Sequence, residues 1–172
     1  TPDIANLMAI ADLFQISVDE LLSNEKSEKK QSNYIYESRT EYDIDGKKNF
    51  DIKLGGAYAV DLKAYHGEKN EVAMFSNVYK NLLADYKVKI DDIKNRIDIN
   101  LNRFNEASEA DAKESLVITI FIPVKYIGKI ELSVNAGTLN ITDIENEHIE
   151  VNGKISEVTL QGNKSEIEID SN

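Results

Sequence analysis

The chain has 172 residues, no cysteine and a net charge of −11, from 20 basic and 31 acidic side chains. At about 150 residues per domain, this length predicts one domain with at most a small addition. Without cysteine there is neither a disulfide framework nor a thiolate zinc site. The acidic balance disfavours nonspecific binding to nucleic acid or anionic lipid. The longest uncharged apolar run, residues 116–124, is too short to span a bilayer.

The first 25 residues contain acidic side chains but no Lys or Arg, and they predict two short helices. Thr1 and Pro2 suit the start of a helix, and apolar residues follow at helical spacing. Ser17 and Glu20 form a capping box for the second helix. Helices this short are marginal alone, so we expect their apolar stripe to be covered by the rest of the chain or by a second copy. The stripe consists of Leu7, Ile10, Phe14, Leu21 and Leu22.

This segment resembles the last two helices of a Cro/CI-type (XRE) helix-turn-helix domain. The resemblance is carried by Pro2-Asp3, Leu7, Ile10-Ala11, Leu13-Phe14 and residues 16–22. It implies a transcriptional regulator whose DNA-reading helices precede Thr1, so that DNA is contacted only through helices missing from this sequence. An unrelated helical hairpin is the alternative. Because Thr1 stands where a helix begins, we expect the chain to be a fragment of a longer gene product.

The next segment has no apolar side chain between residues 23 and 33, which predicts a charged linker. We therefore divide the chain into a helix-turn-helix remnant (1–25), a linker (26–33) and a β-rich domain (34–172). Turns are predicted at Gly55-Gly56, as a hairpin bend, and at Asp91-Asp92. Residues 77–83 suggest one helical turn, and residues 105–114 a loop or a short helix. Strands are predicted at 34–42, 49–54, 57–64, 71–76, 86–91, 96–101 and 116–123.

The C-terminal part contains a repeat of short aliphatic strands separated by polar turns. Ile149, Val158 and Ile167 are nine residues apart, and Val151, Leu160 and Ile169 repeat the spacing. One such unit cannot bury its own apolar pair, whereas stacked units form a continuous core. The repeat predicts a mainly β fold with a β-solenoid-like stack, resembling a right-handed β-helix. A β-sandwich or a meander of small hairpins is the alternative.

This half is similar to the bacterial putative-adhesin family of unknown function. The similarity is carried by the strand that ends at Pro123, by residues 130–141 and by residues 151–155, and it extends over roughly residues 50–172. It implies a β-solenoid-like fold. It also implies a bacterial regulator, because such domains follow helix-turn-helix domains in Firmicute-type regulators.

Candidate chemistry is sparse. Only His66 and His148 are available as histidine ligands or bases, and no Ser or Cys nucleophile motif is present. On a strand, Asp143, Glu145 and Glu147 would share one face and could hold Ca²⁺, although a solvated polar face is the favoured reading and the EF-hand spacing is not met. We therefore predict a protein that is not an enzyme and needs no cofactor.

Two functions remain open. The favoured one is the regulatory or assembly domain of a cytoplasmic transcriptional regulator, and the alternative is an envelope or cell-surface binding module of the adhesin type. In either case we expect self-association through the end of the repeat, where Ile167 and Ile169 are uncovered on one side. Nearby carboxylates disfavour filaments, so we predict a dimer that is strengthened by salt.

Overall fold

The computed structural model describes residues 34–105 and 107–171. These residues are mainly β, which confirms the predicted fold class. The two predicted helices with their apolar stripe and the linker 26–33 lie outside the described residues. The first elements are β1 (Tyr36–Asp43), β2 (Lys48–Tyr65), β3 (Lys69–Ser76), α4 (Leu82–Asp85), β4 (Tyr86–Ile93), β5 (Arg96–Arg103) and α5 (Glu109–Ser115). They are followed by β6 (Val117–Pro123), a 3₁₀ turn (Val124–Tyr126), β7 (Ile127–Thr142), β8 (Glu145–Gly153), β9 (Ile155–Gln161) and β10 (Lys164–Ser171).

Two long bent strands, β2 and β7, organise the sheet. They run parallel to each other over almost their whole length. The first half of β2 also pairs with β5 and its second half with β6, so β2 has partners on both sides. The bend in β2 lies at Gly55, where the pairing register shifts and φ is +72°. The predicted hairpin at Gly55-Gly56 is therefore wrong, because the backbone turns a corner there and keeps β7 as its neighbour.

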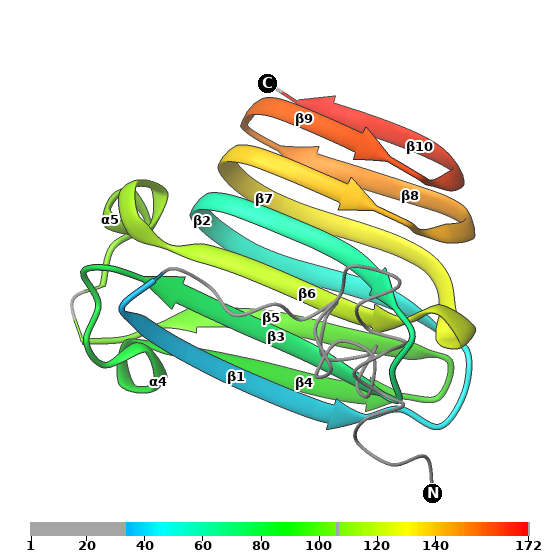
Figure 1. Ribbon diagram of the computed structural model, residues 1–172, viewed down its shortest axis with the longest axis horizontal. Helices are drawn as coiled ribbons and strands as arrows, with labels where there is room; N and C mark the ends of the chain where they lie inside the picture. Colours follow the sequence, from blue (N-terminus) through cyan, green and yellow to red (C-terminus); the bar gives the residue numbers. More distant parts are fainter. Residues whose placement is uncertain (1–33, 106, 172) are drawn as a thin grey trace, which may run out of the picture. The chain divides into compact units, whose positions relative to one another are not determined.

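The bends fold one open, mixed, ten-stranded sheet into two layers around one core (Figure 1). One layer contains β4, β5, β8 and β10 together with the first halves of β2 and β7. The other layer contains β1, β3, β6 and β9 together with the second halves of β2 and β7. Ile52 and Leu132 from the first layer and Val60 and Leu139 from the second are all fully buried in the same hydrophobic cluster. Alternate residues of each strand therefore point into the core and out of it.

The C-terminal strands stack in register as successive turns. In one layer Phe50, Ile130, Ile149 and Ile167 lie opposite one another on β2, β7, β8 and β10. Val158, nine residues after Ile149, lies in the other layer beside Leu139. One nine-residue repeat unit therefore makes half a turn of the stack, and two units make a full turn. The alternative of a hairpin meander is wrong, since β9 and β10 do not pair with the strands that precede them and β8 pairs with β7 in parallel. The parallel stack is compatible with the solenoid prediction.

Asparagine side chains join successive turns at their corners. The Asn163 amide accepts a hydrogen bond from the backbone N–H of Ile144 at 2.9 Å and donates one to the carbonyl of Ile141 at 2.8 Å. Asn135 accepts a hydrogen bond from the backbone N–H of Lys154 at 3.0 Å. These bonds satisfy backbone groups that the ladder leaves unpaired where the chain turns.

The remaining predicted strands are confirmed with adjusted ends, and the helical turn predicted at 77–83 lies later in the chain, as α4 at Leu82–Asp85. Five of the predicted strands appear with ends shifted by at most two residues, while 49–54 and 57–64 merge into β2. Asp91-Asp92 is not a turn but part of β4, and the chain reverses after it at Lys94, where φ is +54°. The helix within 105–115 is α5, which Ser108 caps by accepting a hydrogen bond from the backbone N–H of Asp111 at 3.0 Å.

Candidate functional site: a charged cleft on the outer face of the sheet

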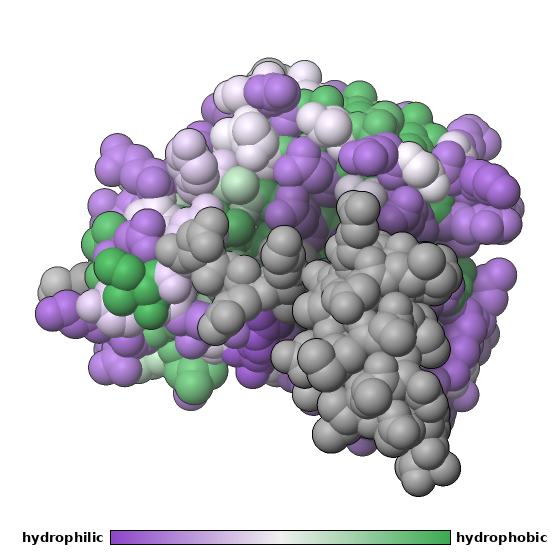
Figure 2. Space-filling model, in the orientation of Figure 1, coloured by the Kyte–Doolittle hydropathy of each residue, from purple (hydrophilic) through white to green (hydrophobic). Residues whose placement is uncertain are grey.

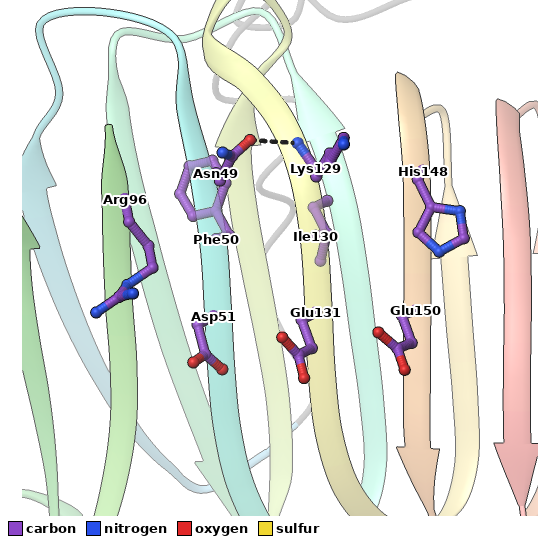
Figure 3. Close-up of a pocket in the computed structure, with 9 residues that line it drawn as sticks. All are labelled: Asn49, Phe50, Asp51, Arg96, Lys129, Ile130, Glu131, His148 and Glu150. Atoms are coloured by element: carbon purple, nitrogen blue, oxygen red, sulfur yellow. Dashed lines mark hydrogen bonds between the residues drawn. The ribbon is translucent and has the colours of Figure 1, made fainter. Parts of the chain in front are cut away.

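A cleft of about 250 Å³ lies on the outward face of the first layer, where β5, β2, β7 and β8 run side by side (Figure 3). Every residue that lines it stands on one of these strands, so the site is held by rigid backbone rather than by a loop. The lining consists of Asn49, Phe50, Asp51, Arg96, Lys129, Ile130, Glu131, His148 and Glu150.

Carboxylates form an aligned row across this face. The strand register places Asp98, Asp51, Glu131, Glu150 and Glu168 opposite one another on β5, β2, β7, β8 and β10. We call these five residues the carboxylate row. Neighbouring strands are about 4.8 Å apart, so the row is about 19 Å long. Like charges that stand directly opposite each other across a strand pair destabilise a sheet.

The two ends of the row have basic neighbours, but its middle does not. Arg96 donates hydrogen bonds to both carboxylate oxygens of Asp98, at 2.7 and 3.2 Å. At the other end, Nε2 of His148 lies 3.8 Å from the Glu168 carboxylate. Among the described residues, no basic side chain lies within 4.0 Å of Asp51, Glu131 or Glu150. Within residues 34–105 and 107–171, the middle of the row therefore has no basic side chain in ion-pair distance.

Asp51 is the most constrained member of the row. Its Oδ1 atom is buried and has no hydrogen-bond partner among the described residues. A buried carboxylate oxygen without a donor is unfavourable, because it has lost water and gained nothing in return. The Asp51 carboxylate is therefore packed against the floor of the cleft, with one oxygen out of reach of solvent.

A row of basic and amide side chains lies beside the carboxylates. In Figure 3, Asn49, Lys129 and His148 occupy the upper part of the cleft and Asp51, Glu131 and Glu150 the lower part, while the Arg96 side chain extends down towards the level of the carboxylates. Asn49 Oδ1 accepts a hydrogen bond from the backbone N–H of Lys129 at 2.8 Å, which ties β2 to β7. The Lys129 ammonium turns towards Glu147, at 3.8 Å. The cleft therefore contains both acidic and basic side chains.

The sequence-predicted metal ligands do not form a site. Asp143 is not in a strand, because β7 ends at Thr142 and Asp143 occupies the following turn with φ of +58°. Its backbone N–H donates to the carbonyl of Gln161 at 2.9 Å. Glu145 and Glu147 stand on β8, so the predicted shared face of all three is wrong. No group of three or more His, Asp or Glu residues within 34–105 and 107–171 is arranged to hold a metal ion.

The predicted interaction residues at the end of the repeat are partly uncovered. Ile167 and Ile169 stand on β10 with their side chains on the core side, and Ile169 is 36% exposed. Leu160 on β9 is 46% exposed. Figure 2 shows hydrophobic surface over the end of the stack where β9 and β10 lie.

The carboxylate row was missed from the sequence although a signal for it exists. Each member stands between two apolar residues, in the pattern apolar–acid–apolar. The five segments are Phe50-Asp51-Ile52, Ile97-Asp98-Ile99, Ile130-Glu131-Leu132, Ile149-Glu150-Val151 and Ile167-Glu168-Ile169. The pattern predicts that each acid points outward, but only the strand register reveals that the five acids align.

No protein-family model and no curated protein matches the sequence. Among solved structures, a putative cell adhesion protein from Clostridium sporogenes is similar with a TM-score of 0.40 and 7% identity, over 80% of this chain and 99% of that one. A putative adhesin from Parabacteroides merdae has a TM-score of 0.32 and 14% identity, over 78% of this chain and 58% of its own. A putative lipid binding protein from Parabacteroides distasonis has a TM-score of 0.30 and 11% identity, over 78% of this chain and 60% of that one.

This chain thus spans less than two thirds of the second and third of these proteins. Because each TM-score is below 0.5, the likeness assigns no role to any residue here. As for membranes, none of the helices in the described part of the chain is long and apolar enough to cross one.

Proposed function

We propose that residues 34–171 form a non-catalytic binding module whose charged cleft holds a partner that carries several positive charges. The observation that carries the proposal is the set of three aligned carboxylates, Asp51, Glu131 and Glu150, without a counter-charge in the described part of the chain. This assignment corresponds to the surface-module alternative of the sequence interpretation.

Three aligned carboxylates lower the stability of the folded chain when nothing is bound to them. An outward position on a central strand accepts many residue types, and like charges opposite each other raise the free energy of the folded state. A bound cation removes this repulsion and supplies donors to the accessible oxygens of the carboxylates. Hydrogen bonds between charged groups are about twice as strong as neutral ones. Partner binding is therefore a physical reason for the row.

The proposal is for binding. His148 lies 3.8 Å from Glu168 and 4.0 Å from Glu166, beyond hydrogen-bond reach of either carboxylate. That the protein is not an enzyme stays a prediction.

The regulatory-domain function remains a prediction. It depends on the helix-turn-helix resemblance in residues 1–25, which lie outside the described residues. A cytoplasmic location belongs to that function and a cell-surface location to the binding module. The carboxylate row favours the module, because it provides a site that a purely structural regulatory domain does not need.

Calorimetric titration with the tetra-amine spermine tests the proposal, with a monoamine for comparison. We expect spermine to bind the unmodified chain, and the E131Q/E150Q variant to bind it at least about tenfold more weakly, since two charge-assisted contacts are lost. The matched control is E157Q on β9, which removes one charge in the other layer and should leave the affinity unchanged. Equal weakening by E157Q, or no binding to the unmodified chain, would refute the proposal.

A further inference from the structure

We infer that β10, which pairs only with β8 among the described residues, takes up along its other edge an extended segment of a partner protein in which aliphatic and basic residues alternate. The inference rests on the proposed function and deepens it, because it names the class of partner and where that partner adds to the sheet.

The first observation is the unpaired edge. Within the described residues, β10 pairs only with β8, and β9 only with β7. The backbone N–H and C=O groups on the outer side of an edge strand can pair with another extended chain. Strand addition of this kind is a recurrent way in which proteins bind extended peptides.

The second observation is the open end of the core. Ile169 on β10 and Leu160 on β9 point to the core side, yet they are 36% and 46% exposed. The equivalent residues one turn earlier, Val151 and Ile141, are fully buried because the next turn covers them. A strand added to β10 with aliphatic residues on its core side would cover Ile169 in the same way.

The third observation is the charge on the other side of β10. Glu166, Glu168 and Asp170 alternate with the isoleucines and point outward, and the side chains of Glu166 and Glu168 are 82% and 69% exposed. Side chains directly opposite on a neighbouring strand approach to about 5 Å, so basic residues at alternate positions of an added strand would meet these carboxylates.

Continuity with the carboxylate row selects β10 over β9. Glu168 is the last member of the row, so a basic residue opposite it continues the row with the opposite charge. The outward residues of β9 are Glu157, Thr159 and Gln161, with a single carboxylate. A basic partner strand is therefore attracted more strongly to the β10 edge.

A second copy of the chain is the competing occupant, as in the predicted dimer. Two β10 strands paired edge to edge would bring the same three carboxylates together, in a chain with a net charge of −11. Opposite charges across a strand pair stabilise it, whereas like charges destabilise it. The charge pattern thus favours a basic partner over self-pairing.

The test uses the full chain and a fluorescent eight-residue peptide in which Lys alternates with Val. A peptide in which Glu alternates with Val is the control ligand. We expect the Lys–Val peptide to bind by fluorescence anisotropy and to slow amide hydrogen exchange along β10, measured by NMR. The E166K/E168K variant should bind it at least about tenfold more weakly and should gain binding of the Glu–Val peptide. E157K on β9 is the matched control and should bind the Lys–Val peptide within about twofold of the unmodified chain.

Three results would overturn the inference, and the second separates it from the proposed function. The first is equal weakening by E157K and E166K/E168K. The second is peptide binding that shifts the signals of Asp51, Glu131 and Glu150 but leaves exchange along β10 unchanged, in which case the cleft binds cations and the edge does not. The third is protection of β10 that rises with protein concentration in the absence of peptide, which identifies a second copy. Because slowed exchange is measured on the unmodified chain, the test does not depend on the variants being folded.

Discussion

The inner and last turns of the stack share one sequence pattern and differ in what covers them. In the inner turn, Ile130 on β7 has Phe50 of β2 on one side and Ile149 of β8 on the other, and it is 1% exposed. In the last turn, Ile169 on β10 has Val151 on one side only and is 36% exposed. The same aliphatic–acid–aliphatic segment therefore builds core in one place and an accessible edge in the other. Whether a copy of the repeat is buried or accessible therefore depends on the strands that pack beside it and not on its residue types.

Truncating one isoleucine in each turn should give the largest effect. We expect I130A to lower the free energy of unfolding by about 3 kcal/mol, because a buried Ile loses its contacts and leaves a cavity. I169A should lower it by about 1 kcal/mol or less, since part of this side chain already contacts water. Urea denaturation followed by circular dichroism measures both. Equal losses would show that another part of the molecule or a second copy covers the last turn.

A glycine at the corner between the turns offers a sharper test of the stacking. Gly153 has φ of +136°, and a Cβ there would lie 1.8 Å from the carbonyl oxygen of Val134 on the preceding turn. We expect G153A to lower the free energy of unfolding by about 2 kcal/mol, because both the backbone conformation and the close approach disfavour a side chain. Gly46 has no atom within 4 Å of such a Cβ, so G46A is the control and should change stability by less than about 0.5 kcal/mol. A neutral G153A would contradict the stacking of this corner.

The aromatic first half should respond to alkaline pH, and the aliphatic last turns should not. Tyr86 on β4 is fully buried, and burial raises the pKa of its phenol well above the usual value of about 10. The folded state therefore holds this proton more tightly than the unfolded state. Its contribution is fully present below about pH 10 and is lost as the pH rises above that value. We expect unfolding to become easier by about 1 kcal/mol between pH 10 and 11.

The Y86F variant should remove most of this alkaline slope, because burial, with the Tyr79 hydroxyl nearby, is what raises the pKa of Tyr86. Urea titrations at pH 7, 10 and 11 measure the slope for both proteins. An identical slope in Y86F would assign the effect to other groups.

Local structure was largely predictable from particular residues. Alternating apolar positions identified the strands, and the nine-residue spacing from Ile149 to Ile167 identified a repeat that buries its aliphatic pairs in a shared core. Gly55-Gly56 was assigned to the right position but to the wrong geometry, since a corner and a hairpin use the same residue type. The three Ca²⁺ candidates do not share one strand face, because Asp143 belongs to a turn. A spacing of two residues indicates a shared face only within one strand.

The mainly β fold class and most strand positions could be predicted from the sequence, because these depend on neighbours within a few residues. Tertiary structure alone decided that successive nine-residue units alternate between two layers, so that Ile149 meets Ile167 and not Val158. It also decided that Asp51 aligns with Glu131, 80 residues away, and that β10 pairs on one side only among the described residues. Strand register is set by how the whole core packs, and no local pattern contains that information.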